Sequence, residues 1–246
     1  MPWNFAEGWP PSYSAFGRMR ALLSVQQASG LRPRRMLEIA AGDGSLSAVL
    51  AAAGCEVVAN DLRGQHLRQN LKAFTNGDQV EMVEGNVLEM DPDQIGRFDL
   101  VVACEIIEHV AHSELFLGHL ARFLTPSGNI LVTTPNGAYF RNKLPTLSQI
   151  SDFDRLESRQ FRPDADGHLF LITPMEFSKL AERCGLNVVS MGVWGTPWLT
   201  GHCKLSTFSS SWWTRPAYAA EAWTQSLPWK LRERVCFSLT AVLRLS

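Results

Sequence analysis

The sequence predicts an α/β protein in which a doubly wound, mostly parallel, seven-stranded sheet carries helices on both faces. Short segments with strand character alternate with helical segments, a pattern typical of parallel sheets joined by right-handed crossovers. Two of the strand segments, Asp99–Ala103 and Asn129–Thr133, are almost continuously apolar. Strands of that kind are usually covered on both faces.

The elements follow one another in a regular order. A first helix is expected from Arg18 to Ser29 and should end at Gly30. A later helix should begin at Pro174, after Thr173 as N-cap, and end at Gly185. Seven strands are expected, over residues 36–40, 56–60, 80–84, 98–103, 129–133, 187–193 and a segment within 201–208.

The stretch from Met36 to Leu50 organises the chain. It begins as a buried strand, turns through the small residues Ala40–Gly44, and continues as a helix for which Ser45 is the expected N-cap. Such a turn directs free backbone N–H groups towards whatever lies beyond the end of the strand. Glu38, just before the turn, would repel a pyrophosphate and would favour a ligand that carries an ammonium or sulfonium group.

The next strand ends in an acid. Asp61 lies 19 residues after Gly42, where a carboxylate can accept hydrogen bonds from the hydroxyls of a ribose. The alternative role for Asp61 is to cap the helix that follows it. The spacing favours the ribose.

These residues resemble the class I S-adenosylmethionine (SAM)-dependent methyltransferases, and the resemblance covers most of residues 18–195. Glu38-x-Ala-x-Gly-x-Gly fits the family's glycine loop, with Ala40 in place of the first glycine. The added methyl group is tolerated if φ at Ala40 is negative. The segments Phe98–Val110 and Ile130–Asn136 look like the family's fourth and fifth strands with the residues after them.

The resemblance implies a Rossmann-like fold and SAM as cofactor. Asp61 matches the family's ribose acid, and Asn86 stands where the family usually has the aspartate that flanks adenine. The cofactor-binding residues implied are Glu38, Ala40, Gly42, Gly44, Asp61, Leu62, Asn86, Val87 and Cys104.

Candidate catalytic groups follow the fourth strand. Methyl transfer from a sulfonium needs alignment of the reactants and exclusion of water, and a hydroxyl acceptor also gains from a general base. His109 and Glu105 are the expected catalytic residues, with Glu108 and His112 beside them in the chain. A helix that began near Ile106 would place Glu105, Glu108 and His109 on one face.

A metal site is the competing interpretation of this cluster. Glu-x-x-Glu-His followed by a later histidine resembles the small-RNA 2′-O-methyltransferases. The first part also resembles the ubiquinone-pathway O-methyltransferases, which act on a catechol-like ring. The implied ligands of a divalent metal are Glu105, Glu108, His109 and His168. We favour a structural role for these residues over a metal.

The composition of the chain limits which partners and which cellular compartment are expected. The formal net charge is −1, and no basic strip with aromatic residues lies in the catalytic region, so nucleic acid is not favoured. The five cysteines are scattered, which predicts a reducing compartment without a disulfide framework. No signal peptide or membrane-spanning run is recognisable. We therefore expect a cytoplasmic protein.

Three regions are expected. Residues 1–30 form an aromatic segment and a helix, residues 31–200 form the cofactor-binding domain, and residues 201–246 form a strand and a helical tail. Within the domain, the polar insertion 137–167 is the candidate substrate lid. The tail is basic and rich in tryptophan, and Leu231, Val235, Leu239, Val242 and Leu245 follow helical spacing. We favour its packing on the domain or on a second subunit, as in a homodimer, over contact with an anionic membrane surface.

The sequence thus predicts a SAM-dependent methyltransferase that acts on a small molecule, at oxygen rather than nitrogen. A lipid- or sugar-linked acceptor would suit the tail. The alternatives are an NAD(P)-dependent oxidoreductase and a SAM-binding subunit without catalysis. The oxidoreductase is disfavoured because the chain lacks a G-x-G-x-x-G motif and has an acid, Glu38, just before the glycine turn.

Overall fold

The computed structural model describes residues 15–74, 76–160, 167–200 and 214–246. Its strands form one seven-stranded sheet in the order β3-β2-β1-β4-β5-β7-β6, which confirms the predicted fold class. The strands are β1 (Arg35–Ile39), β2 (Glu56–Asp61), β3 (Val80–Glu84), β4 (Phe98–Cys104), β5 (Leu124–Pro135), β6 (Leu186–Trp194) and β7 (Ser238–Leu245).

The helices connect these strands. They are α1 (Ala15–Gly30), α2 (Ser45–Ala52), α3 (Gly64–Leu71), α4 (Pro92–Ile95), α5 (Ser113–Ala121), α6 (Asp154–Glu157), α7 (Pro174–Arg183), α8 (Thr214–Thr224) and α9 (Trp229–Val235). Short 3₁₀ turns are η1 (Gly77–Gln79), η2 (Val87–Glu89), η3 (Ile107–His109) and η4 (Leu147–Gln149). The strand order reverses between β1 and β4, and ligands of doubly wound sheets bind at such a switch point.

The chain divides into two compact units. The first contains the described residues up to Cys104 and the segment His119–Leu131. In it β1 pairs in parallel with both β2 and β4, and β2 pairs in parallel with β3. Leu37, Val58 and Val101 are fully buried in these strands. The carboxyl ends of the strands therefore meet at one edge, and the loops that follow them come together there.

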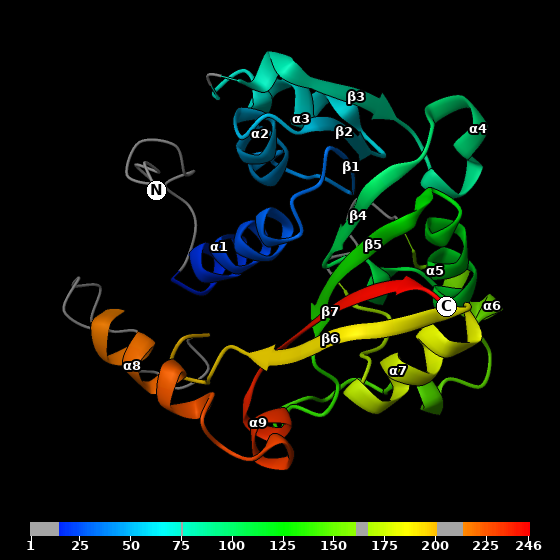
Figure 1. Ribbon diagram of the computed structural model, residues 1–246. Coiled ribbons are helices and arrows are strands. Elements are labelled where there is room, and N and C mark those ends of the chain that lie inside the picture. Colours follow the sequence, from blue (N-terminus) through cyan, green and yellow to red (C-terminus); the bar gives the residue numbers. More distant parts are fainter. Residues whose placement is uncertain (1–14, 75, 161–166, 201–213) are drawn as a thin grey trace. The chain divides into compact units, whose positions relative to one another are not determined.

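The second unit contains Glu105–Gly118 and Val132–Arg244. Helix α7 packs on β6 and begins as predicted: Thr173 accepts from Glu176 N, and the Glu176 side chain accepts from Thr173 N. Strands β6 and β7 run in opposite directions (Figure 1). Their ends are joined by hydrogen bonds from Phe237 N to Gly195 O and from Ser246 N to Gly185 O.

Strand β7 corrects the prediction for the tail. The helical spacing of Leu239, Val242 and Leu245 predicted a helix, but Ser238–Leu245 is a strand in which the first six residues are all buried. A strand covered on both faces has no alternating pattern, so periodicity alone cannot distinguish it from a buried helix. The strand predicted within 201–208 lies outside the described residues.

Helix α2 and strand β5 differ in detail from the prediction. The N-cap of α2 is Gly44 rather than Ser45, because Gly44 adopts the left-handed conformation, and Asp43 accepts from Ser45 N instead. The fifth strand is longer than the predicted 129–133, since it begins at Leu124 and ends at Pro135. The aromatic segment 1–14 lies outside the described residues.

The described cysteines are all free thiols: Cys55, Cys104, Cys184 and Cys236. None of the helices in the described ranges combines the length and the apolar character needed to cross a bilayer.

Candidate functional site

The glycine turn forms the centre of the first unit's site. Ala40, Gly42 and Gly44 have φ angles of +53°, +58° and +73°. Ala41 N donates to Asn60 O, which joins the turn to the neighbouring strand β2. A negative φ was the condition under which alanine would be tolerated at position 40, and the structure does not meet it. A non-glycine residue in this conformation is strained by about 1–2 kcal/mol, and such strain is concentrated at functional sites.

The two glycines of the turn have different roles. A Cβ atom built on Gly42 would have only Ala40 O within 4 Å, at 3.9 Å, so the space beside Gly42 is open. A Cβ atom on Gly44 would lie 2.7 Å from Leu71 Cδ2 and 2.8 Å from Leu67 Cδ1. Gly42 therefore leaves room for a ligand, and Gly44 leaves room for helix α3.

Asp61 joins the end of β2 to the glycine turn. Its Oδ2 accepts from Gly42 N at 3.0 Å, and its Oδ1 accepts from Arg63 N at 3.1 Å. The N-cap of α3 is Arg63, so Asp61 does not cap that helix. Each carboxylate oxygen can accept a further hydrogen bond, which leaves Asp61 able to bind a hydroxyl.

Asn86 follows β3 and is the N-cap of η2, where its Oδ1 accepts from Leu88 N at 3.1 Å. Val87 next to it is buried. Asn60, which the sequence analysis missed, donates from Nδ2 to Val83 O and Gly85 O and so fixes the end of β3. A polar residue inside an apolar strand was the available signal for Asn60.

The two remaining expected cofactor residues differ in exposure. Leu62, after β2, is 42% exposed, which is unusual for a large apolar side chain and leaves a surface for a ring to cover. Cys104, at the end of β4, is half-buried, and its Sγ lies 3.7 Å from Ser24 Oγ of α1.

Glu38 lies below the turn rather than in it. It is 6% exposed, and its Oε2 accepts from Ser47 Oγ at 2.5 Å. Burial raises the pKa of Glu38 to about 7, and the hydrogen bonds from Ser47 only partly oppose that effect. This hydrogen bond joins β1, which contains Glu38, to α2, which contains Ser47.

In the second unit, three of the four expected metal ligands lie together. Potential ligand atoms of Glu108, His109 and His168 all lie within 4.8 Å of one another. Glu108 Oε1 is 4.0 Å from His109 Nε2 and 3.9 Å from His168 Nε2. The two imidazole rings meet edge to face with centroids 4.9 Å apart. Glu108 is completely buried, whereas the two histidines are partly exposed.

Glu105 is not a member of this cluster. The segment after β4 forms a short 3₁₀ turn, so Glu105 does not share a helical face with Glu108 and His109 as expected. Glu105 instead has φ +53°, and its Oε1 accepts from Thr133 Oγ1 at 2.9 Å. His112 is also separate, since its Nε2 lies 3.0 Å from Glu157 and 3.4 Å from Asp154 of α6.

His168 reaches the cluster because the end of the insertion 137–167 is attached to η3. Leu169 N donates to Glu108 O at 2.9 Å, and Ile172 pairs with Asn136 beyond the end of β5. Burial lowers the pKa of His168. The ring is therefore neutral near pH 7, the form that accepts a proton or binds a metal.

Comparisons with known proteins agree with this geometry. A family model described as "Methyltransferase domain" matches residues 13–191. The ubiquinone biosynthesis O-methyltransferase of Bordetella avium (strain 197N) is 32% identical over 169 residues, which are 68% of each protein.

Two solved structures share the fold. The CcbJ methyltransferase from Streptomyces caelestis has a TM-score of 0.61 and 18% identity, covering 97% of this chain and 93% of that one. The Burkholderia thailandensis 1,6-didemethyltoxoflavin-N1-methyltransferase, solved with its substrate and S-adenosylhomocysteine, has a TM-score of 0.55 and 16% identity, covering 96% and 80%. With its strand order, glycine turn and family match, the chain belongs to the class I SAM-dependent methyltransferases.

Proposed function

We propose that this protein methylates a hydroxyl oxygen of a small molecule and that His109 is the general base. The observation that supports this proposal is the contact of Glu108 with two histidines in a segment that directly follows β4. The cofactor, when bound, supplies an electrophilic methyl group on a positively charged sulfur. The chain's own task is to bind, to align and to accept a proton.

The first unit supplies the cofactor-binding residues. Asp61 would accept hydrogen bonds from the ribose hydroxyls, and the open backbone beside Gly42 would approach the ligand closely. Asn86, Val87 and Leu62 would surround the adenine, and Cys104 would line the end of β4. Glu38 acts indirectly, because its hydrogen bond from Ser47 holds the turn and α2 in place.

The second unit supplies the base. His109 is partly exposed and can accept a proton from an acceptor hydroxyl, and the buried Glu108 carboxylate stabilises the imidazolium that forms. Glu105 would orient the acceptor, because Thr133 holds its carboxylate at the end of β4.

A divalent metal is the second candidate role for the same cluster. One carboxylate and two imidazoles within 4.8 Å form a donor set that suits zinc, manganese or iron. These residues fit such an ion, which would lower the pKa of an acceptor hydroxyl. Glu105 lies outside the set, so the ligands would be Glu108, His109 and His168.

A phenolic acceptor is the class that the relatives favour. The Bordetella avium relative is a ubiquinone biosynthesis O-methyltransferase, and its name supports an aromatic, lipid-linked acceptor here as well. We therefore propose a catechol-like ring, with a sugar-linked alcohol as the alternative.

The tail supports a peripheral role. Trp223 of α8 is 63% exposed and Leu231 of α9 is 54% exposed, beside the basic residues Lys230, Arg232 and Arg234. An anionic membrane surface or a second copy of the chain would cover such residues. Co-sedimentation with anionic vesicles tests membrane binding, and size-exclusion chromatography tests for a homodimer. Both are measured for the protein and for the double variant Trp223→Ser/Leu231→Ser.

A thermal-shift titration tests the cofactor assignment. SAM, S-adenosylhomocysteine, NAD and NADP are each added with and without manganese, zinc or a chelator. An adenosyl ligand at about 100 times its dissociation constant stabilises the protein by about 2.7 kcal/mol, a shift of several degrees. A shift with NAD alone would contradict the proposal. A further shift that a chelator removes would support the metal.

His109→Ala tests the base. With a catechol as acceptor, release of S-adenosylhomocysteine should fall by about 10²–10⁴-fold. Binding of S-adenosylhomocysteine should not change. Full turnover and unchanged metal binding in this variant would eliminate both roles of His109.

A further inference from the structure

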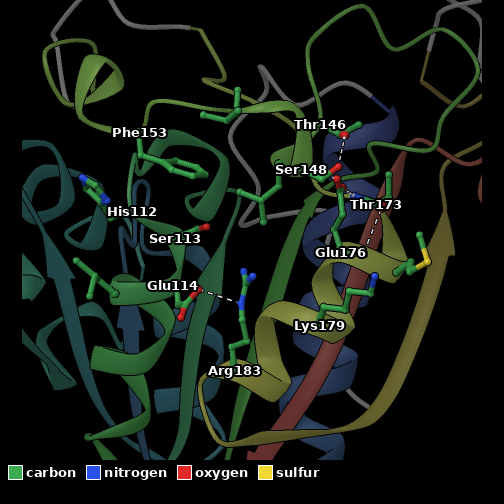
Figure 2. Close-up of a pocket in the computed structure, with 14 residues that line it drawn as sticks. His112, Ser113, Glu114, Thr146, Ser148, Phe153, Thr173, Glu176, Lys179 and Arg183 are labelled. Atoms are coloured by element: carbon green, nitrogen blue, oxygen red, sulfur yellow. Dashed lines mark hydrogen bonds and ion pairs between the residues drawn. The ribbon is translucent and has the colours of Figure 1, made fainter.

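The second unit contains a pocket that the proposed reaction does not use. It lies between the first residues of α5, the insertion around η4, and α7, and it encloses about 660 Å³ (Figure 2). Pockets of this volume commonly hold small organic ligands. Leu115, Met175, Leu147, Ile150 and Phe153 provide its apolar lining.

Two of these apolar side chains are unusually exposed. Leu115 of α5 and Met175 of α7 are each 67% exposed, although each lines the pocket. A ligand with an apolar body would cover both side chains, and their burial would favour its binding.

The helix α7 supplies two cations to the same pocket. Lys179 and Arg183 are four residues apart and so lie on one face of the helix. Arg183 Nε is 3.0 Å from Glu114 Oε2 of α5, an ion pair that fixes the guanidinium. The other guanidinium nitrogens point away from Glu114 towards the middle of the pocket (Figure 2).

Lys179 has no anionic partner among the residues that the structure describes. Two acids, Glu176 and Glu182, lie three residues from Lys179 on the same helix. The Glu176 carboxylate accepts from Ser148 N and Thr173 N, both at 2.8 Å, and Glu182 forms no ion pair with Lys179 in the part of the chain that the structure describes. His112, at the other wall, lies against Glu157 and Asp154. Glu114 is paired with Arg183 Nε, so Lys179 Nζ and the other guanidinium nitrogens of Arg183 are the cationic donors of the described lining that are left for a ligand.

We propose that this pocket binds a small amphipathic anion, with an apolar or aromatic body and one carboxylate or sulfonate group. The anionic group would accept hydrogen bonds from Lys179 Nζ and the Arg183 guanidinium, and the body would lie against Met175 and Leu115. None of the lining residues belongs to the glycine turn or to the Glu108–His109–His168 cluster. The pocket therefore shares no residue with those two groups, although part of the insertion 137–167 lines it.

Calorimetric titration of the full chain with 2-naphthoate and its uncharged counterpart 2-naphthamide tests the proposal. We expect Lys179→Met to weaken binding of 2-naphthoate about tenfold, the effect of one charge-assisted contact, and to leave 2-naphthamide unchanged. Met175→Ala should weaken both ligands. The control, Lys230→Met, removes an equally exposed lysine of α9 that does not line the pocket.

Three results would overturn the proposal. One is the absence of 2-naphthoate binding at millimolar concentration, and another is equal affinity for the acid and the amide. The third is displacement of 2-naphthoate by saturating S-adenosylhomocysteine, because the probe would then occupy the cofactor site. If S-adenosylhomocysteine did not bind to the protein in the absence of 2-naphthoate, only the proposed function would be contradicted. The two failures are therefore distinguishable.

Discussion

Thr134 Oγ1 donates a hydrogen bond of 2.9 Å to Glu108 Oε2, and both residues are completely buried. The other carboxylate oxygen lies towards His109 and His168. Thr133, the preceding residue of β5, holds Glu105 in the same way. Because successive strand residues point to opposite faces, two adjacent threonines position two different carboxylates.

Removing the Thr134 hydroxyl should affect the cluster. We expect Thr134→Val to cost about 1–3 kcal/mol of unfolding free energy, because the buried Glu108 carboxylate loses its donor. The same loss leaves the Glu108 carboxylate less firmly held beside His109, so methyl transfer should also slow. Methyl transfer to a catechol at a fixed pH checks the second effect.

Two variants control this experiment. Thr134→Ser retains the hydroxyl and should restore the wild-type stability and rate. Thr133→Val removes the other hydroxyl and should leave the contact between Thr134 and Glu108 in place. If Thr134→Val lowered stability but left the rate of methyl transfer unchanged, Thr134 would have only a structural role.

Glu38 should make stability depend on pH. Its pKa is about 7 in the folded protein and 4.5 in a model peptide, so the folded state binds more protons between these values. Unfolding free energy should therefore fall as pH rises from about 4.5 to 7, by about 3 kcal/mol, and then level off. Glu38→Gln should remove this contribution.

Urea unfolding at several pH values measures the effect of Glu38→Gln. Glu81→Gln, at an exposed position of β3, is the matched control and should keep the wild-type slope. An unchanged slope in Glu38→Gln would show that the carboxyl group is not protonated on folding.

The two glycines of the turn should respond differently to alanine. Gly42→Ala should lower the unfolding free energy by about 1–2 kcal/mol because of the positive φ. It should also weaken binding of S-adenosylhomocysteine, because the methyl group enters the open space left for the ligand. Gly44→Ala should lower the unfolding free energy by about 1–3 kcal/mol more than Gly42→Ala does, because its methyl group meets Leu67 and Leu71. Denaturant unfolding and calorimetry separate the two effects. Equal stability of the variants would contradict this division.

Asp61→Asn should weaken binding of S-adenosylhomocysteine about 10–100-fold, since the amide loses the charge that strengthens hydrogen bonds from ribose hydroxyls. The Asn side chain retains one oxygen, which can accept from Gly42 N or from Arg63 N but not from both. Unfolding free energy should therefore fall by about 1 kcal/mol, the contribution of one hydrogen bond. Calorimetry with S-adenosylhomocysteine and with adenine distinguishes the ribose contact, because adenine binding should be unaffected.

Local patterns predicted much of the fold. The capping box at Thr173 and Glu176 and the strands at 56–60 and 80–84 lie where the sequence placed them, because caps and short apolar segments depend on neighbours in the chain. Strand β7 was predicted as a helix instead, since a fully buried strand lacks a diagnostic period. The left-handed Ala40 could not be predicted either, because the surrounding structure imposes that conformation.

The sequence by itself determined the order of the first six strands, the glycine turn and the acid at the end of the second strand. Residue type and spacing along the chain suffice for these features. Only the tertiary structure decided that Glu108 meets His168 from the far end of the insertion, and that Glu105 is excluded from their cluster. It also placed Thr133 and Thr134 beneath the two carboxylates. Such contacts join residues 26 or more positions apart, and their geometry depends on the packing of buried side chains rather than on any local signal.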